Sequence, residues 1–430
     1  MKYTPMGKGY IAAILCFAFV FFSSCQQVKP VPSRPPADST GICSALAIIE
    51  EPCFNNFDDS AVNIRKFNIV GGDPYQLCVI RAEIYMADLV FQKSKRMALY
   101  VDDELDINGR WIGEKIISND TNTIAVKRVV KLNNEGQLNI NLQIGNSQNN
   151  ATGRWEVSLM EVVPIGDDND YAVYTSDNQS VEAVFMRDSI ADFTQHEQIQ
   201  KNIELLCVIR DSIKAFVGGK EPYEGTTTYI CTELVPYSGL AGNPIYINYG
   251  DVDKLLGSLY IEKVTRELKK TDFISVFCHE MSHTFDGINS TNIDAPYNFE
   301  KEFFALLKQV YALNDVGFSL DPEYIGAKPS LDTGIYSYEV FLSEIMQFLD
   351  LPENDENWQH IKSTMYEFDL AKDCGVLEAF STFIDNLSNK SGVDLKNCFG
   401  DKAWETLYKR FGQSKSSENQ AMYTKDIPSN

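Results

Sequence analysis

Residues 272–287 read Asp-Phe-Ile-Ser-Val-Phe-Cys-His-Glu-Met-Ser-His-Thr-Phe-Asp-Gly, and the expected fold of the second half of the chain follows from them. An apolar residue recurs at every fourth position of this stretch: Phe273, Phe277, Met281 and Phe285. This spacing marks one face of an α-helix, so it predicts a helix from about Asp272 to Asp286 with that face buried. Thr271-Asp272 is a suitable N-cap, and Gly287 is a suitable stop.

His279 and His283 lie on the other side of this predicted helix, in the pattern His-Glu-x-x-His. Imidazoles four residues apart project from one helix face and can share a zinc ion, while Glu280 between them can act on a water at that metal. The chain has four histidines, so a chance match is rare. The motif predicts a zinc metallopeptidase with His279 and His283 as ligands and Glu280 as general base.

A third protein ligand is expected, because zinc in hydrolases takes three protein ligands and leaves the fourth position to water. Glu302 is the first candidate: eighteen residues (284–301) separate it from His283, and it begins a helical pattern that continues to about Leu313. Glu300 is a rival, since it lies nearer the middle of that helix's apolar arc. Glu378, on a later amphipathic helix, is a more distant alternative, for which a core-helix glutamate is the favoured interpretation.

The motif and its spacing to Glu302 resemble the gluzincin superfamily of zinc metallopeptidases. Glu302-Phe303-Phe304-Ala305 is similar to the ligand segment of its aminopeptidase branch, in which the glutamate is followed by Gly-Phe-Ala. The same segment resembles that of lethal-factor-like proteases, and Asp286 occurs at a matching place in them. The resemblance implies Zn²⁺ as cofactor, Glu302 as third ligand and Asp286 as a residue that orients a ligand imidazole, although a solvated Asp286 is equally compatible with the sequence.

Other families fit less well. A metzincin would have glycine and then histidine or aspartate where this chain has Asp286 and Asn289. Enhancin-like gluzincins usually carry glycines soon after the motif, which residues 284–289 largely lack. Two segments nevertheless resemble theirs faintly: Gly242 to Ile247, as an edge strand, and Leu387 to Leu395. The superfamily is therefore expected, and the family within it stays open.

Tyr297 is the candidate for stabilising the oxyanion, because it opens the predicted ligand helix. With 21 tyrosines in the chain, a role as a core or cap residue is the competing interpretation.

Residues 1–25 resemble the signal peptide of a bacterial lipoprotein. Lys2 and Lys8 precede an apolar run from Tyr10 to Phe22 that suits a signal sequence, and Ser23-Ser24 precede Cys25, the expected lipidation site. Phe22 departs from the usual leucine or valine, so plain cleavage or a retained anchor stay open. Residues 26–60 are expected to be a proline-rich tether and lead-in. The predicted location is the bacterial cell envelope, anchored by lipid at the outer membrane or cell surface, otherwise periplasmic or secreted.

Residues 61–170 are expected to form an antiparallel β-sandwich. Five segments have the pattern of short strands: Cys78 to Tyr85, Arg96 to Val101, Ile124 to Leu132, Leu138 to Ile144 and Trp155 to Val163. Asn133-Asn134-Glu135-Gly136 between two of them predicts a hairpin. Evenly spaced short strands without a helical stretch are typical of a sandwich.

Residues 171–413 are expected to be a mainly helical catalytic domain of gluzincin type with a small sheet, which makes the fold class α+β. The predicted strands are Thr226 to Leu234 and Pro244 to Asn248. The other predicted helices are Gln198 to Phe216, Val252 to Lys270, Tyr338 to Leu349, Trp358 to Phe368, Gly375 to Leu387 and Asp401 to Phe411. Residues 414–430 are a polar tail.

Composition narrows the partners. The net charge of −22 argues against nucleic acid, whose binders carry basic patches. Eight cysteines follow the leader without a CxxC pair, and Cys278 beside His279 is expected to be a buried apolar residue rather than a redox switch.

The sequence therefore predicts an exported, membrane-anchored zinc metallopeptidase that hydrolyses proteins, peptides or glycoproteins. An endopeptidase is favoured because no Gly-Ala-Met-Glu-Asn segment occurs to hold a substrate amine. The alternative is a surface lipoprotein that binds glycan or protein through its β-domain and carries an inert metallopeptidase-like domain.

Overall fold

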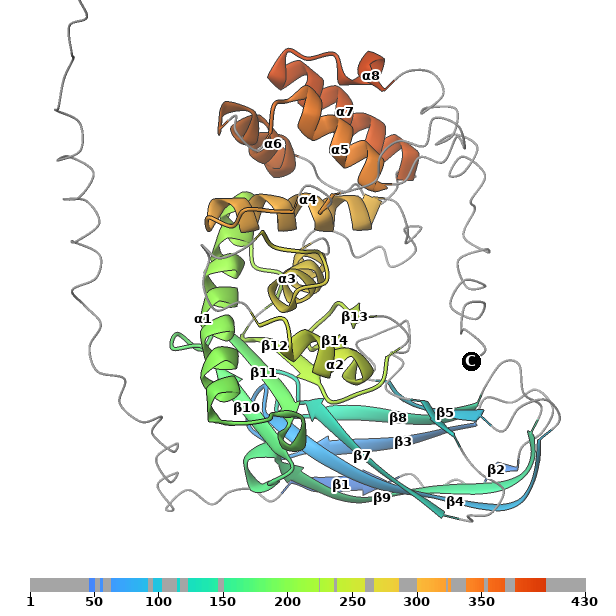
Figure 1. Cartoon of the computed structure of the whole chain (residues 1–430). Coiled ribbons are helices and arrows are strands. Elements are labelled where there is room, and N and C mark those ends of the chain that lie inside the picture. Colours follow the sequence, from blue (N-terminus) through green and yellow to red (C-terminus); the bar gives the residue numbers. More distant parts are fainter. Residues whose placement is uncertain are drawn as a thin grey trace, which may run out of the picture. The chain divides into compact units, whose positions relative to one another are not determined.

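The computed structural model describes residues 46–50, 55–56, 63–91, 96–102, 114–116, 123–145, 151–223, 225–235, 238–259, 267–285, 300–321, 324–325, 338–351, 355–367 and 376–399. Within them the chain is α+β, as predicted: strands dominate the first part and helices the second (Figure 1). No helix in these ranges is long and apolar enough to cross a membrane. The predicted signal peptide with Cys25, the helix 401–411 and the polar tail lie outside them.

Two antiparallel sheets form the first part. One has the order β1-β3-β8-β5-β6, with β1 (Ala47–Glu50), β3 (Asn63–Val70), β8 (Leu138–Gly145), β5 (Arg96–Asp102) and β6 (Glu114–Ile116). The other has the order β2-β9-β4-β7, with β2 (Asn55–Asn56), β9 (Ala151–Pro164), β4 (Leu77–Phe91) and β7 (Thr123–Lys131). All five predicted strands lie at these places. One apolar cluster includes Phe67 and Leu138 of the first sheet and Val79 and Val129 of the second.

The predicted hairpin between β7 and β8 is wrong, although its turn is present. The Gly136 amide donates to the Asn133 carbonyl, and Gly136 has a φ of 70°, which favours glycine. The strands on either side belong to different sheets, because β7 pairs with β4 and β8 pairs with β3 and β5. A local turn signal does not encode which neighbour each strand will pair with.

A third, mixed sheet has the order β10-β11-β12-β14-β13. Its strands are β10 (Tyr171–Thr175), β11 (Val181–Met186), β12 (Thr227–Cys231), β14 (Ile245–Ile247) and β13 (Gly239–Leu240). The helix α1 (Phe193–Phe216) connects β11 to the parallel strand β12 and packs on β10 and β11. The two predicted strands correspond to β12 and β14. β13 pairs antiparallel with β14 and forms one edge of the sheet.

The third sheet packs against the antiparallel sheets through one shared apolar cluster. Val184, Ile230 and Tyr246 belong to the same apolar cluster as Val79 and Val129. Polar contacts join the same elements. Arg128 forms an ion pair with buried Glu233 at 3.0 Å, and the buried Lys131 ammonium donates to the Thr226 carbonyl, the Thr228 hydroxyl and the Asn243 side chain. The antiparallel sheets therefore support the sheet that carries β13.

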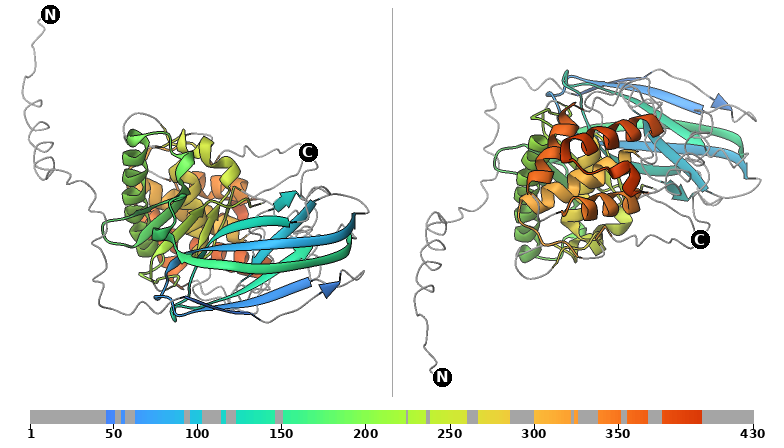
Figure 2. Two further views of the ribbon diagram at one scale, coloured as in Figure 1. Left: turned by 90° about the horizontal axis from the view of Figure 1, so that it is seen from below. Right: turned by 90° about the horizontal axis from the view of Figure 1, so that it is seen from above.

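The remaining helices are α2 (Tyr249–Leu256), α3 (Phe273–Thr284), α4 (Glu300–Asp315), α5 (Tyr338–Phe348), α6 (Asp355–Glu367), α7 (Val376–Ser391) and α8 (Leu395–Cys398). Short 3-10 turns occupy Ile165–Asp167 and Arg187–Ser189. Figures 1 and 2 show the orange and red helices α5 to α8 gathered next to α4, and α4 and α5, α4 and α7, and α6 and α7 are in contact.

The predicted helix from Val252 to Lys270 is wrong at residues 257–259 and 267–270, and residues 260–266 lie outside the described ones. Helix α2 ends at Leu256, with Gly257 as its C-cap. Further on, the backbone of Leu268 is extended and pairs with residues 319–321: its amide donates to the Ser319 carbonyl, and its carbonyl accepts from the Asp321 amide. This long-range pairing overrides the local helical pattern, because the backbone groups are satisfied by a distant segment.

Helix α3 is present as predicted and buries the expected face. Phe273, Phe277, Met281 and Phe285 are at most 4 % exposed. Burial of each such side chain stabilises the fold by about 1.5–3 kcal/mol. The helix begins at Phe273, but the Asp272 side chain does not cap it; it accepts from the Lys269 amide, while the Phe273 amide donates to the Ser258 hydroxyl.

Candidate metal centre

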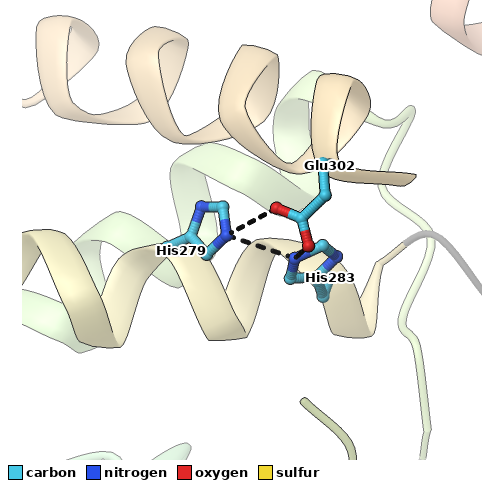
Figure 3. Close-up of side chains that lie close together, drawn as sticks. All are labelled: His279, His283 and Glu302. Carbon is cyan, nitrogen blue, oxygen red and sulfur yellow. Dashed lines mark hydrogen bonds and ion pairs between the residues drawn. The ribbon is translucent and has the colours of Figure 1, made fainter. Parts of the chain in front are cut away.

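Helices α3 and α4 pack against each other and bring three metal-ligating side chains together (Figure 3). Nε2 of His279 lies 3.2 Å from Nε2 of His283 and 3.2 Å from Oε2 of Glu302. Nε2 of His283 lies 3.4 Å from Oε1 of Glu302. The ligand atoms of His279, His283 and Glu302 all lie within 4.8 Å of one another, close enough to share one metal ion.

The spacing of these atoms fits a tetrahedral zinc ion. Zinc bonds of about 2.0–2.1 Å at tetrahedral angles separate neighbouring ligand atoms by about 3.3 Å, which agrees with the three measured distances. Two imidazoles and one carboxylate are also the donor set of many catalytic zinc sites, in which the fourth position is left to water. His279, His283 and Glu302 are therefore suited to hold Zn²⁺ together.

The environment keeps Glu302 ionised. Burial would raise the pKa of its carboxyl, but the close imidazoles of His279 and His283 outweigh this effect and hold the pKa well below its usual range. An ionised carboxylate next to two imidazoles attracts a cation. This charge pattern agrees with the ligand geometry.

Gln309 on α4 determines which nitrogen of His279 carries the proton. Its side-chain amide donates to the Ser275 carbonyl at 2.7 Å and to the Tyr324 hydroxyl at 2.7 Å. Because the Ser275 carbonyl can only accept, the Gln309 nitrogen must face it, and the Gln309 oxygen must then face His279 Nδ1, at 3.1 Å. Nδ1 therefore carries the hydrogen, and a neutral His279 presents the lone pair of Nε2 to the metal.

Sequence reasoning assigned this orienting role to Asp286 and missed Gln309. Asp286 lies outside the described residues. A signal for Gln309 was present, since a glutamine lies within the apolar arc of the predicted ligand helix, seven residues and about two turns after Glu302. Gln309 is 1 % exposed, and a buried amide at that position requires polar partners.

The opposite face of α4 is held by aromatic packing. Phe303 and Phe304 are buried and meet Phe383 of α7 edge-to-face, with ring centroids 5.9 and 5.0 Å apart. On the other side of the site, the Tyr229 hydroxyl of β12 donates to the Phe277 carbonyl of α3 at 2.8 Å. Both ligand helices are thus fixed to elements that carry no ligand.

Glu280 lies against the edge strand β13. A methyl group added to Gly239 would come within 2.4–2.5 Å of Cγ, Cδ and Oε1 of Glu280, so only glycine leaves room for this carboxyl. Glu280 is 8 % exposed, and burial raises the pKa of its carboxyl, while the adjacent imidazoles of His283 and His279 lower it. A buried carboxyl with a raised pKa next to a metal site is suited to accept and return a proton.

A cavity of about 450 Å³ opens beside this carboxyl. His279, Glu280 and Val276 of α3 line it, together with Ser238 next to β13. The predicted base therefore faces a space large enough for a ligand.

Tyr297, the candidate for stabilising the oxyanion, lies outside the described residues. The side chains of Glu300 and Glu378, the alternative third ligands, lie outside them too. Cys278 is fully buried, and burial raises the pKa of its thiol to about 12, in agreement with an inert apolar role.

Comparison with known proteins does not assign a family: no protein-family model matches the sequence, and no curated protein matches it as a relative.

The third ligand can be tested by substitution. We expect Glu302→Ala to weaken zinc binding by more than the roughly 10–100-fold that loss of an outer-shell partner costs, because a direct ligand is removed. Glu300→Ala is the matched control and should retain zinc. Chelator competition measures both affinities, and the reverse order would make Glu300 the ligand.

Gln309 can be tested separately. Gln309→Leu should lower zinc affinity about 10–100-fold, since His279 loses the acceptor that holds its Nδ1–H. Gln347→Leu, at an exposed glutamine of α5, is the control. Thermal unfolding of the metal-free variants would show whether the fold is kept. Unchanged zinc affinity in folded Gln309→Leu would contradict the orienting role.

Proposed function

We propose that this protein is a zinc-dependent metallopeptidase of gluzincin type that hydrolyses peptide bonds of proteins, peptides or glycoproteins. The observation that carries the proposal is the convergence of His279, His283 and Glu302 at the spacing of zinc ligands, with Glu280 beside them. Zn²⁺ bound there would lower the pKa of a coordinated water and polarise the scissile carbonyl.

Glu280 is the proposed general base. It is adjacent to His279 in sequence and is buried, and burial raises the pKa of its carboxyl above the ordinary value, the direction that favours proton exchange. In this role it accepts a proton from the attacking water and then delivers it to the leaving amine. Gly239 leaves the space that this carboxyl occupies, since a side chain there would meet it.

The edge strand β13 supports endopeptidase action. β13 pairs with β14 on one side, and an extended substrate can add to the other side as a further strand. Backbone pairing of this kind recognises the middle of a peptide without a free terminus. Because Gly239 of β13 touches Glu280, the added strand would run past the proposed base.

We also propose the domain architecture. The two antiparallel sheets share one apolar cluster, which supports a β-sandwich at residues 61–170. The mixed sheet and the packing of α3 on α4 support a gluzincin-type catalytic domain at residues 171–413. We further propose export by the signal at residues 1–25 and a lipid anchor at Cys25, which would place the protein at the bacterial cell envelope.

The central test is Glu280→Gln. This change should leave zinc binding and folding intact while lowering peptide cleavage by about 10²–10⁴-fold, the usual contribution of a general base. Glu197→Gln, at an exposed glutamate of α1, is the control. Undiminished cleavage by Glu280→Gln would remove Glu280 as base.

Metal analysis separates the enzyme from the alternative of an inert binding lipoprotein. The purified protein should hold about one zinc per chain, lose cleavage with a chelator and regain it with Zn²⁺. Less than about half an equivalent under saturating zinc would refute the enzyme.

Gly239→Ala tests how Glu280 is positioned. The added methyl group must displace the carboxyl, and a misplacement of about 1 Å can cost about a hundredfold in rate. We therefore expect the rate of peptide cleavage by Gly239→Ala to fall by up to about a hundredfold. Zinc affinity should stay unchanged, because no ligand moves. Gly166→Ala, which meets nothing within 4 Å, is the matched control. Full activity of Gly239→Ala would show that Glu280 is not constrained by β13.

A further inference from the structure

The segment that carries the edge strand β13 is held at both of its ends by one strand of the antiparallel sheets. This β13 segment comprises residues 233–235 and 238–243, and the strand that holds it is β7, at the edge of its own sheet. Arg128 of β7 contacts Glu233 at the start of the segment, and Lys131 of β7 contacts Asn243 at its end. Two side chains of one strand therefore fix a segment that belongs to another sheet.

The contact at the start of the segment is a buried ion pair. Nε of Arg128 lies 3.0 Å from Oε2 of Glu233, and the two side chains are 14 % and 2 % exposed. The Val129 amide and the Thr232 hydroxyl donate to Oε1 of the same carboxylate, at 3.3 and 3.2 Å. This network fixes the position of the carboxylate, because a movement would leave a buried charge without its partners.

The contact at the end of the segment is made by a buried ammonium group. Lys131 is 7 % exposed, and its ammonium donates to the Asn243 side-chain oxygen at 3.1 Å. The same group donates to the Thr226 carbonyl and to the Thr228 hydroxyl, each at 2.7 Å. An ammonium has three hydrogens, and these three acceptors use all of them. Lys131 therefore ties the end of the β13 segment to β7 and β12 together.

Both contacts are charged within a common pH range. Burial raises the pKa of Glu233 to about 7, against the effect of nearby Arg128. Burial lowers the pKa of Lys131 to about 8, against the effect of nearby Glu182. Between these two values the carboxylate and the ammonium are both the predominant forms, so the measurements below belong in that range.

Apolar packing supports the middle of the segment. Val235 is 5 % exposed and belongs to the apolar cluster of the antiparallel sheets, and Leu240 of β13 packs against that cluster. Side chains alternate along a strand, so Gly239 faces the opposite side, where it leaves room for Glu280. β13 therefore lies between the antiparallel sheets and the proposed base.

The backbone groups of Gly239 point away from β14. Just before β13, the Ser238 carbonyl accepts from the Asn248 amide, which makes these residues a hydrogen-bonded pair of the antiparallel ladder. Such pairs alternate with pairs that are not hydrogen-bonded, and the next pair is Gly239 with Ile247. The amide and carbonyl of Gly239 thus lie on the outer side, where an extended substrate can add.

We propose that Arg128 and Lys131 are positioning residues for substrate binding, which hold the β13 segment where its outer backbone groups and Glu280 can meet one peptide. The antiparallel sheets are then a part of the substrate-binding apparatus and not a separate binding module. The inference rests on the proposed function and deepens it by giving these sheets a role in the same site. Both residues act through the β13 segment.

Hydrogen exchange tests this hold directly. The Asn248 amide donates to the Ser238 carbonyl, so its exchange reports opening of the β13 segment. In Arg128→Met and in Lys131→Met this exchange should be about tenfold or more faster than in the wild-type protein, because each change removes hydrogen bonds of a charged group. Equal exchange in the wild-type protein and both variants would overturn the inference.

Two further variants separate the hold from general destabilisation. Lys127→Met is the matched control, since this lysine of β7 forms its ion pairs with Asp168 and Asp170 and should leave the exchange unchanged. Arg128→Lys should restore most of the slow exchange, because it keeps a cation next to Glu233. If Arg128→Met does not fold, Glu233→Gln removes the same charge pair with a smaller change in shape, and it should also accelerate the exchange.

Peptide binding connects the hold to the substrate. Blocked fluorescent peptides are titrated onto zinc-loaded, full-length Glu280→Gln protein. Adding Arg128→Met or Lys131→Met should weaken peptide binding about tenfold or more, and in the protein with Glu280 each change should raise KM by a similar factor, while zinc affinity stays unchanged. Unchanged peptide affinity, or a loss of zinc affinity of the same size, would contradict a positioning role.

The same measurements distinguish failure of the inference from failure of the proposed function. Faster exchange together with weaker peptide binding supports the positioning role even if no peptide is cleaved. Absence of peptide binding to zinc-loaded Glu280→Gln protein overturns the inference. Absence of cleavage by zinc-loaded wild-type protein that binds the peptides counts against the proposed function alone.

Discussion

The packing of α3 against α4 is the contact on which the candidate site depends. It brings the Glu302 carboxylate of α4 to 3.2 and 3.4 Å from the imidazole nitrogens of His279 and His283, which lie 3.2 Å apart on α3. This arrangement of electron pairs needs a proton or a cation between them. The helices also bury apolar side chains on other faces, Phe273 and Phe277 on α3 and Phe303 and Phe304 on α4. The free energy of this apolar burial offsets the repulsion within the polar cluster, which a metal ion would relieve.

The residues around the three metal-ligating side chains each position one particular group of the site. Gln309 uses both ends of its amide, so the same group that ties α4 to the Ser275 carbonyl also sets the tautomer of His279. Tyr229 connects the β-sheet to the backbone of α3, and Gly239 gives the Glu280 carboxyl its place. The antiparallel sheets contribute from further away, since Lys131 and Arg128 hold the loops that flank β12 and β13.

Sequence patterns were most informative where a signal is local and repeated. The four-residue apolar spacing located α3, and its burial is confirmed by Phe273, Phe277, Met281 and Phe285. Alternating strands and the turn at Gly136 were also recognised. The errors occurred where a distant segment decides the outcome: Leu268 pairs with the backbone near Ser319 instead of extending α2, and β7 and β8 diverge after their turn into separate sheets.

The sequence by itself determined the chemistry of the residues and their spacing along each helix: two histidines and a glutamate on α3, and a glutamate near the start of α4. Helical periodicity follows from the local backbone, so these relations need no tertiary contact. The tertiary structure alone decided that Glu302 meets both imidazoles, that Gln309 orients one of them, that Gly239 faces Glu280, and that Arg128 and Lys131 contact the segment that carries β13. Each of these contacts joins segments far apart in the chain, and their distances are set by how helices and strands pack together.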